Sequence, residues 1–249
     1  MPFTLSHPAI VLPLISRHSK WFSTTGLVVG SLIPDFEYFL RMKIQSLYSH
    51  TLPGLFFFDL PLALVVCFLF HTIIRDSLLD NLPHFLKSRL SYFQNFAWIN
   101  YFKQHAWIVV FSIIIGTVSH LLWDAFTHET GFFVLKLTYL QHHLSIGHID
   151  IPVYKICQHT STLIGALCIG IFIFNLKKAN ALRKSKQGPY WFLILAVVII
   201  IVLLRLLFAI QTIHIGDIIV TALAAIFLAL MICPFLLQLC FWSTINNKE

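Results

Sequence analysis

The chain has 249 residues, of which 58% are hydrophobic and only 11% are charged, and its formal net charge is +7. Soluble domains carry about 25% charged residues, so this composition excludes an ordinary soluble globular protein and predicts an integral membrane protein. The positive charge does not indicate a nucleic-acid partner, because the basic residues form no patch with interleaved exposed aromatic residues.

Residues 1–54 are predicted to form a helical or re-entrant element rather than a regular span. The stretch 26–40 is apolar, but it is interrupted by Pro34 and becomes polar at Asp35 and Glu37. Irregular backbone survives at membrane depth only where protein covers it or where it lines a water-filled cavity. We therefore expect a half-helix or re-entrant segment that other helices cover. No cleavable signal peptide is expected, since the first residues lack a basic region.

Five long apolar runs follow, each close to the ~20 residues that a helix needs to cross about 30 Å of hydrocarbon. They cover roughly 55–74, 107–126, 157–176, 191–210 and 218–241. Trp107 and Trp191 open two of these runs, as is typical of aromatic residues at a membrane interface. The sequence predicts an all-α polytopic membrane protein in which residues 1–249 form a single domain, with a transmembrane bundle over 55–241.

The segment 75–106, between the first two spans, mixes apolar and basic residues. This pattern suits an amphipathic helix lying on the cytoplasmic leaflet. It suits an ordinary packed connector equally well, and the sequence does not decide between the two.

The segments between the spans also predict which side faces the cytoplasm. The N-terminal region, the loop 127–156 and the turn 211–217 share one side, and the more basic loops 75–106 and 177–190 lie opposite with the C-terminus. The basic residues of the N-terminal region are Arg17, Lys20, Arg41 and Lys43. The positive-inside rule places the more basic side in the cytoplasm. Of the 13 histidines, only His71, His84 and His105 then fall on the cytoplasmic side. Histidines far apart in the sequence can therefore converge on the other side.

The strongest signal for a site is the repetition of His120, Asp124 and His128 every four residues at the end of an apolar run. In a helix these residues fall within about 80° of one another and share a face. Imidazole and carboxylate groups are costly in or near hydrocarbon unless they are paired, line a wet cavity or bind metal. We expect a first-row metal site, and a buried polar network or a wet vestibule is the alternative.

Further candidates lie elsewhere in the chain. His7, Asp35 and His50 stand out in the N-terminal region, although Asp35 could instead cap the helix that follows Pro34. His159 could complete a site at the beginning of a later span. The loop histidines His142, His143 and His148 could touch a metal or a substrate, but solvated loop histidines are commoner.

Four segments resemble a bacterial membrane family that is known only as a domain of unknown function (number 4184). They are residues 1–9 (MPFTLSHPA), 49–54 (SHTLPG), 119–128 (SHLLWDAFTH) and 154–161 (YKICQHTS). This resemblance covers most of the chain and implies a polytopic helical membrane protein without assigning an activity.

A more distant resemblance is to membrane-bound metal-dependent hydrolases and, behind them, zinc-dependent phospholipase C. Those proteins share an N-terminal His, a Pro-Asp segment, a His about fifteen residues later and a His-x3-Asp pair. The resemblance implies that the matching ligands here are His7, Asp35, His50, His120 and Asp124. Those enzymes also use an N-terminal Trp and a further His-x3-acid pair, which this sequence lacks, so one or two ions are expected rather than three.

Together these observations predict a metal-dependent hydrolase, with phosphoesters as the favoured class. Zn²⁺ is the favoured divalent cation, Asp35 and Asp124 are the candidate catalytic carboxylates, and His128 is a sixth candidate ligand. The expected location is a bacterial inner membrane, with the site near the non-cytoplasmic face and membrane lipid as a partner. A transporter or proton-relay protein, a b-type haem protein, or a metal-binding protein without turnover are the alternatives.

Overall fold

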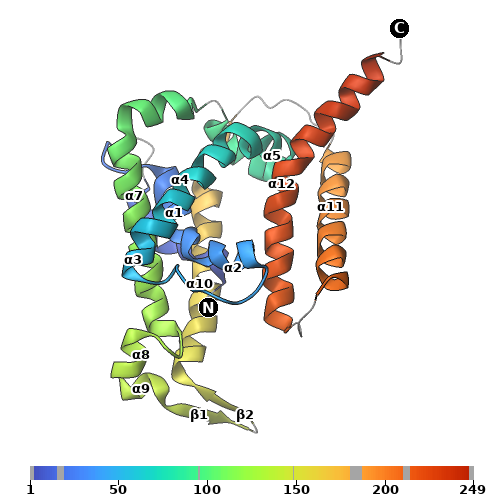
Figure 1. Cartoon of the computed structure of the whole chain (residues 1–249). Coiled ribbons are helices and arrows are strands. Elements are labelled where there is room, and N and C mark those ends of the chain that lie inside the picture. Colours follow the sequence, from blue (N-terminus) through green and yellow to red (C-terminus); the bar gives the residue numbers. More distant parts are fainter. Residues whose placement is uncertain are drawn as a thin grey trace. The chain divides into compact units, whose positions relative to one another are not determined.

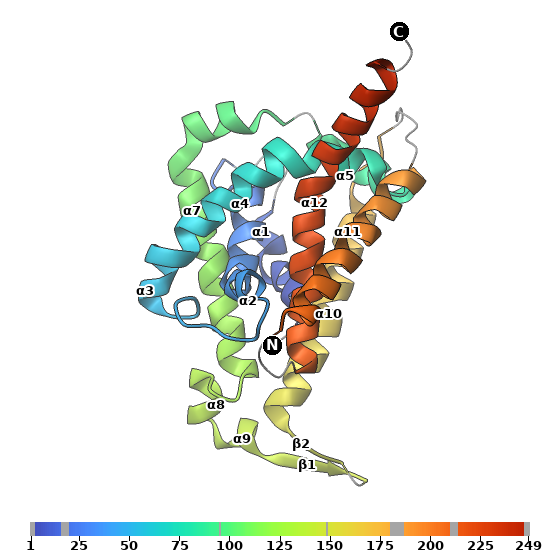
Figure 2. The ribbon, with the colours of Figure 1, turned by 45° about the vertical axis from the view of Figure 1, so that its right-hand side comes forward.

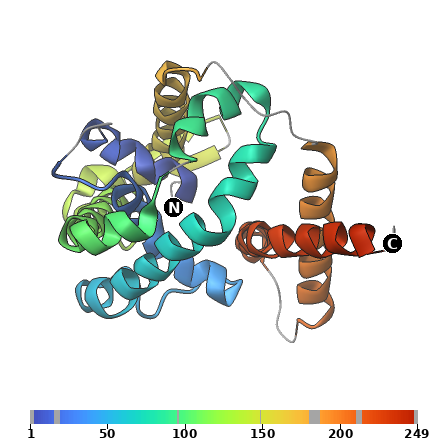
Figure 3. The same ribbon diagram turned by 90° about the horizontal axis from the view of Figure 1, so that it is seen from above.

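The computed structural model describes residues 3–15, 20–94, 96–147, 149–179, 187–209 and 214–246, and Figures 1 to 3 show the ribbon from three directions. The chain divides into two compact units. One comprises Met1–Asp35, Tyr48–Cys67 and Ile99–Asn175, and the other Phe36–Leu47, Phe68–Trp98 and Leu176–Glu249. The organisation of residues 1–249 as one domain stays a prediction.

The first unit is built on two long helices, α7 (Trp98–Thr127) and α10 (Val153–Asn175). The 3-10 helix η1 (Thr4–Leu14) packs against α10 and against α1 (Thr24–Leu32). The other elements of this unit are short: η2 (Ile33–Asp35), α3 (Leu52–Gly54), the π-helix η3 (Leu55–Asp59), α4 (Leu60–Leu69), α8 (Phe132–Lys136), α9 (Thr138–Gln141), and the antiparallel strands β1 (His143–Ile146) and β2 (Ile149–Pro152).

Three glycines let α1 lie directly on α7. Gly26 and Gly30 are one helical turn apart on α1, and Gly116 faces them from α7. A Cβ atom on Gly30 would collide with the backbone of Ile113, and one on Gly116 would collide with the backbone of Leu27. Small residues at this spacing are typical of close helix contacts in membranes. This close contact fixes the position of α1 along the axis of α7. It therefore also fixes the position of the residues that follow α1, including Asp35.

The N-terminal element folds back on itself along α7, as a re-entrant segment would. His7 and Asp35, at its two ends, both lie beside His120 of α7. Between them the chain reaches Phe111, nearer the beginning of α7, where Phe22 stacks with ring centroids 6.4 Å apart. The only shorter apolar helix of 10–17 residues among the described residues is η1, which is too short to span a bilayer.

The same path separates one basic residue from the site. Lys20 lies in a pocket with Trp107 and Phe111, nearer the beginning of α7 and away from its His/Asp end. Lys20 and the site residues His7 and Asp35 therefore lie at different positions along α7, although all three belong to the N-terminal segment. The side of the membrane on which Lys20 lies stays a prediction.

The second unit contains a pair of long helices, α11 (Gln187–Leu207) and α12 (Ile215–Asn246), which pack together (Figures 1 and 2). Tyr190, Ile194, Ala229 and Cys233 form its buried core. Its other elements are α2 (Phe36–Arg41), the π-helix η4 (Phe70–Ile74), α5 (Arg75–Asn81), α6 (His84–Leu90) and η5 (Ser91–Phe93).

Much of the segment 75–106 is a packed connector rather than one surface helix. It folds into short helices in which the basic residues Lys87 and Arg89 are buried. The Lys87 ammonium reaches a carboxylate oxygen of Asp80 at 3.2 Å. Because Lys87 and Arg89 face protein rather than lipid headgroups, α6 is not the amphipathic surface helix of the first alternative.

The described residues include five helices that are long and apolar enough to cross a membrane. They are Leu52–Asn81, Trp98–Lys136, Val153–Asn175, Gly188–Leu207 and Ile215–Leu237. The prediction of an all-α polytopic fold with five spans is confirmed.

Candidate metal centre

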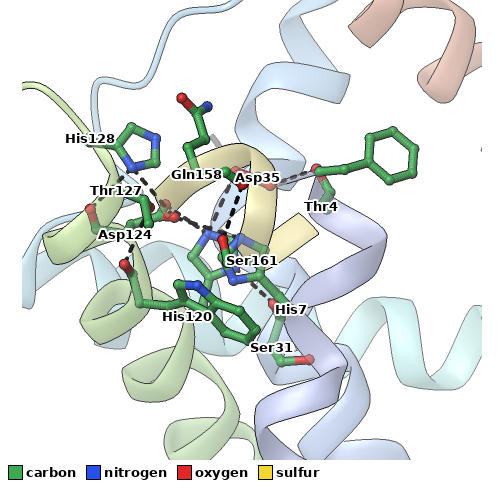
Figure 4. A network of polar contacts seen from close by, with 12 residues as sticks. Thr4, His7, Ser31, Asp35, His120, Asp124, Thr127, His128, Gln158 and Ser161 are labelled. Atoms are coloured by element: carbon green, nitrogen blue, oxygen red, sulfur yellow. Dashed lines mark hydrogen bonds and ion pairs between the residues drawn. The ribbon is translucent and has the colours of Figure 1, made fainter. Parts of the chain in front are cut away.

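The structure brings all six predicted site residues together in the first unit. Three of these residues come from the N-terminal region. His7 lies in η1, Asp35 is the last residue of η2, and His50 lies two residues before α3. The C-terminal part of α7 carries His120 and Asp124, and His128 follows directly after that helix. Figure 4 shows His7, Asp35, His120, Asp124 and His128 pointing toward one another.

Four of these residues form a compact set, which we call the core group: Asp35, His50, His120 and Asp124. Each offers one ligand atom, and the four atoms all lie within 4.8 Å of one another. His120 Nε2 lies 3.2 Å from Asp124 Oδ2, and His50 Nε2 lies 3.5 Å from the same oxygen. Both imidazole nitrogens also lie 3.6 Å from Asp35 Oδ1.

These separations suit ligands of a common cation. Zn²⁺ binds nitrogen and oxygen at about 2.0–2.2 Å in tetrahedral sites, so two of its ligands are about 3.3–3.6 Å apart. A direct N–H···O hydrogen bond would bring the two atoms to about 2.7–3.2 Å. Three of the four nitrogen–oxygen separations in the core group exceed the hydrogen-bond range, and they fall in the range expected for two ligands of one ion. The core group can therefore hold a metal ion.

Contacts outside the core group fix the orientation of its ligands. His120 Nδ1 lies 2.8 Å from the backbone carbonyl oxygen of Ser31, which can only accept, so this nitrogen carries a proton. In the neutral imidazole, Nε2 then faces the site with a lone pair. The Thr4 hydroxyl donates to Asp35 Oδ2 at 2.6 Å, which leaves Oδ1 facing the histidines. Supporting contacts of this kind are characteristic of metal sites.

The backbone around His50 is shaped to present its ring. His50 has φ of 62°, in the left-handed region that few residues other than glycine adopt, and its Nδ1 lies 3.1 Å from the Ser49 hydroxyl. The Thr51 hydroxyl caps the next turn by accepting from the Gly54 amide at 2.9 Å. A Cβ atom on Gly54 would collide with the backbone of Tyr48, so only glycine permits this tight turn.

His7 and His128 lie on the other side of Asp124. His7 Nε2 is 3.6 Å and His128 Nδ1 is 3.4 Å from Asp124 Oδ1. The His7 ring also stacks on the His120 ring, with centroids 3.7 Å apart. One carboxylate oxygen of Asp124 thus faces one pair of histidines and the other oxygen faces His50 and His120. This is the arrangement of a carboxylate that can bridge two ions.

The N-terminal ligands have shifted pKa values. Burial and the neighbouring His120 lower the pKa of His7 to about 3, so its imidazole is neutral and keeps a lone pair. Burial alone would raise the pKa of Asp35, but the neighbouring imidazoles of His120 and His50 outweigh it and lower that pKa. Burial also opposes a charge on His50, yet the adjacent carboxylates of Asp124 and Asp35 raise its pKa to about 9. The cluster therefore combines the neutral imidazole of His7 with an ionised carboxylate, and a metal ion that binds His50 must displace its proton.

Access to the cluster is from the side of His50 and His128. Their side chains are 20% and 25% exposed, whereas the side chains of His7, Asp35 and His120 are completely buried. Figure 4 also shows Gln158 and Ser161 of α10 in the same network. A small molecule or ion from solvent would reach the buried carboxylates by passing the two partly exposed imidazoles.

Sequence reasoning missed the supporting residues Thr4, Ser31 and Ser49. Ser49 precedes a histidine directly, which is a weak local signal. The partners of Thr4 and Ser31 lie on other elements, so the sequence gives no sign of them. The hypothesis that Asp35 is only a helix cap does not fit, because its oxygens face Thr4, His50 and His120.

The remaining candidate histidines lie apart from the core group in the described part of the chain. His143 Nδ1 contacts Asp150 Oδ2 at 2.9 Å on the exposed hairpin of β1 and β2. His142 and His159 are exposed, and His148 lies outside the described residues. These observations fit surface histidines.

The fold and the site together define a polytopic helical membrane protein with a buried His/Asp cluster that can hold a metal ion. Residues 1–235 match the family model described as a domain of unknown function (DUF4184), and the chain belongs to that family. No curated protein and no solved structure matches the chain. The more distant resemblance to metal-dependent hydrolases stays an expectation.

Proposed function

We propose that this protein is a membrane-bound metal-dependent hydrolase that cleaves phosphoesters. The observation that carries the proposal is a set of buried ligand atoms that have no hydrogen-bond partner. Among the described residues they include His120 Nε2, Asp35 Oδ1 and both carboxylate oxygens of Asp124. An unsatisfied buried polar atom costs about 1–3 kcal/mol. A cation in the core group would satisfy His120 Nε2, Asp35 Oδ1 and Asp124 Oδ2 together, and a second ion would satisfy Asp124 Oδ1.

We favour Zn²⁺, with one or two ions, because neutral imidazole and carboxylate ligands suit it. The core group would hold the first ion. Asp124 would extend the site toward His7 and His128 if a second ion binds, since its two oxygens face different histidine pairs. A bound divalent cation would supply an activated water and would stabilise negative charge on the phosphoryl group.

The side chains of the protein would hold and orient the reacting groups. Asp35 keeps one oxygen engaged by the Thr4 hydroxyl, so only Oδ1 can act toward the site. Asp124 has both oxygens available and is the better bridging group, while either carboxylate could accept the proton of the attacking water. His50 and His128, at the entrance, would contact the substrate first.

The proposed location is the inner membrane of a bacterium, with the site near the non-cytoplasmic face. The positive-inside rule supports this orientation. A phosphoester in or near the membrane would then be the substrate, and membrane lipid is the expected partner.

The test is metal content by elemental mass spectrometry, followed by hydrolysis of bis-p-nitrophenyl phosphate. Wild-type protein should contain one or two Zn²⁺ per chain and turn over this substrate. His120→Ala should lose both properties, and His143→Ala, which changes an exposed histidine, should keep both. A chain that takes up no metal on incubation with Zn²⁺ would refute the hydrolase. Stoichiometric metal without turnover of any phosphoester would instead make it a non-catalytic metal-binding protein.

A further inference from the structure

The outer face of α7 carries an apolar stripe toward the His/Asp end of the helix. Val118, Leu122 and Phe126 are exposed and follow one another at four-residue spacing, so they share one face of the helix. This helix is one of the five membrane-spanning candidates. The stripe is therefore the surface that α7 offers to lipid.

The stripe does not end with α7. Phe126 stacks on Phe133 of α8, with ring centroids 4.0 Å apart and planes within 12°. Gly131 makes the intervening turn, in which its amide donates to the His128 carbonyl at 2.9 Å. A Cβ atom at Gly131 would collide with the backbone of Ala125. The turn thus holds α8 directly against the end of the lipid-facing stripe.

Beyond this turn, residues 131–144 expose an unusual number of large apolar side chains, and we call this segment the apolar platform. Phe132 and Tyr139 are 63% and 71% exposed. The exposed apolar residues of the platform are Phe132, Leu135, Leu137, Tyr139 and Leu144. Lys136, between Leu135 and Leu137 in the chain, is also exposed. Figures 1 and 2 show α8 and α9 beyond the end of α7.

The platform is not a loose loop. Val134 and Leu140 are buried with Val153 of α10 in a small hydrophobic core. The Gln141 side-chain amide donates to the Val134 carbonyl at 2.8 Å, and the Val153 amide donates to the His142 carbonyl at 2.9 Å. The inner face of the platform is thus packed against the protein. Its outer apolar face is exposed in the chain alone, so another apolar surface must cover it.

We infer that the apolar platform lies in the interface of the bilayer and binds membrane phospholipid. Its surface continues the lipid-facing stripe, its aromatic residues suit the interface, and Lys136 can meet lipid phosphates. The platform begins three residues after His128, which stands at the entrance of the metal centre. If the proposed function holds, its phosphoester substrate reaches the entrance from this leaflet.

The first experiment tests lipid contact without requiring any activity. The photoreactive residue p-benzoylphenylalanine is placed singly at Phe132 or Leu135 in full-length protein in phosphatidylglycerol/phosphatidylethanolamine vesicles. Intact-mass spectrometry after illumination should show lipid adducts, as at Leu122, the positive control on the stripe. Ser145, which bonds to Asp150 on the exposed hairpin, is the matched negative control. Adducts at Leu122 but none at the platform, or cross-links to a second copy or another protein, would overturn the inference.

The second experiment separates this inference from the proposed function. The double variant Phe132→Ser/Leu135→Ser should keep its metal content and its hydrolysis of soluble bis-p-nitrophenyl phosphate. Its hydrolysis of vesicle phospholipid should fall at least tenfold relative to wild type. If the hydrolysis of both substrates falls equally, or if neither falls, delivery of the substrate across the platform is contradicted. If wild type has no turnover at all, the proposed function fails, and the lipid adducts still decide whether the platform binds lipid.

Discussion

Replacing Asp124 by Asn should remove tight metal binding and leave the metal-free protein folded. Both Asp124 oxygens are buried and face histidine nitrogens at 3.2–3.6 Å. The amide of Asn has no charge, and only one of its two polar atoms can bind a cation. Loss of a supporting contact around a metal site costs about 10–100-fold in affinity. Loss of a ligand that faces four histidines should therefore cost at least about 100-fold.

This loss of affinity has a measurable effect on stability. A metal that binds only the folded state stabilises it by about 2.7 kcal/mol at a free concentration of 100 times Kd. The same concentration equals Kd for a variant that binds 100-fold more weakly, and the stabilisation falls to about 0.4 kcal/mol. The assay is thermal unfolding in detergent at this fixed Zn²⁺ concentration and in chelator, with titration calorimetry to obtain Kd.

The metal-free proteins provide the internal check on this reasoning. Asp124→Asn removes a carboxylate whose contact with His50 raises the pKa of that imidazole, so its unfolding temperature in chelator should lie slightly below that of wild type. Asp150→Asn is the matched control, because that exposed carboxylate also contacts a histidine, and it should keep the full Zn²⁺ shift. If Zn²⁺ raises the unfolding temperature of Asp124→Asn as much as that of wild type, Asp124 is not a ligand. A large loss of stability in chelator would show that it belongs to a structural polar network.

Three further outcomes are expected. Thr4→Val, which removes the hydrogen bond to Asp35, should weaken Zn²⁺ binding about 10–100-fold by calorimetry, and unchanged Kd would contradict the supporting role. Gly30→Ala must push α1 off α7 and should cost about 1–3 kcal/mol in thermal unfolding. Gly170→Ala, with open space around it, should not, and equal effects would argue against the close helix contact. His128→Ala should keep the ion of the core group and lose any second ion by elemental mass spectrometry; complete metal loss would place His128 in the first site.

The part of the site that lies on α7 could be predicted from local spacing. A four-residue repeat in a helix places side chains on one face whatever the surrounding fold, and His120 and Asp124 do share the core group. The five membrane-spanning helices could also be predicted, because the thickness of the bilayer sets the length of an apolar run that crosses it. These predictions depended on helix geometry and composition alone.

The convergence of the N-terminal residues on that face depends on packing that no local pattern specifies. The sequence offers His7 and Asp35 only as separate candidates, and the family resemblance is what groups them with His120 and Asp124. In the structure, the close contact of α1 with α7 places Asp35 beside His120. The same path brings Lys20 beside Trp107 and Phe111, away from the His/Asp end of α7, and no local pattern in the sequence indicates this contact.

The Pro-Asp sequence links this packing to the chemistry of the site. Pro34 has no amide hydrogen, so the carbonyl of Gly30 loses its regular helical donor and accepts from the Thr117 hydroxyl at 3.3 Å. The chain tightens into η2 at this point, and the next carbonyl, of Ser31, accepts from His120 Nδ1 at 2.8 Å. The interruption of the helix thus directs two backbone carbonyls at α7. One of them accepts from His120 of the core group and so orients its ring, while Asp35, the residue after the proline, faces the Nε2 atom of that same histidine.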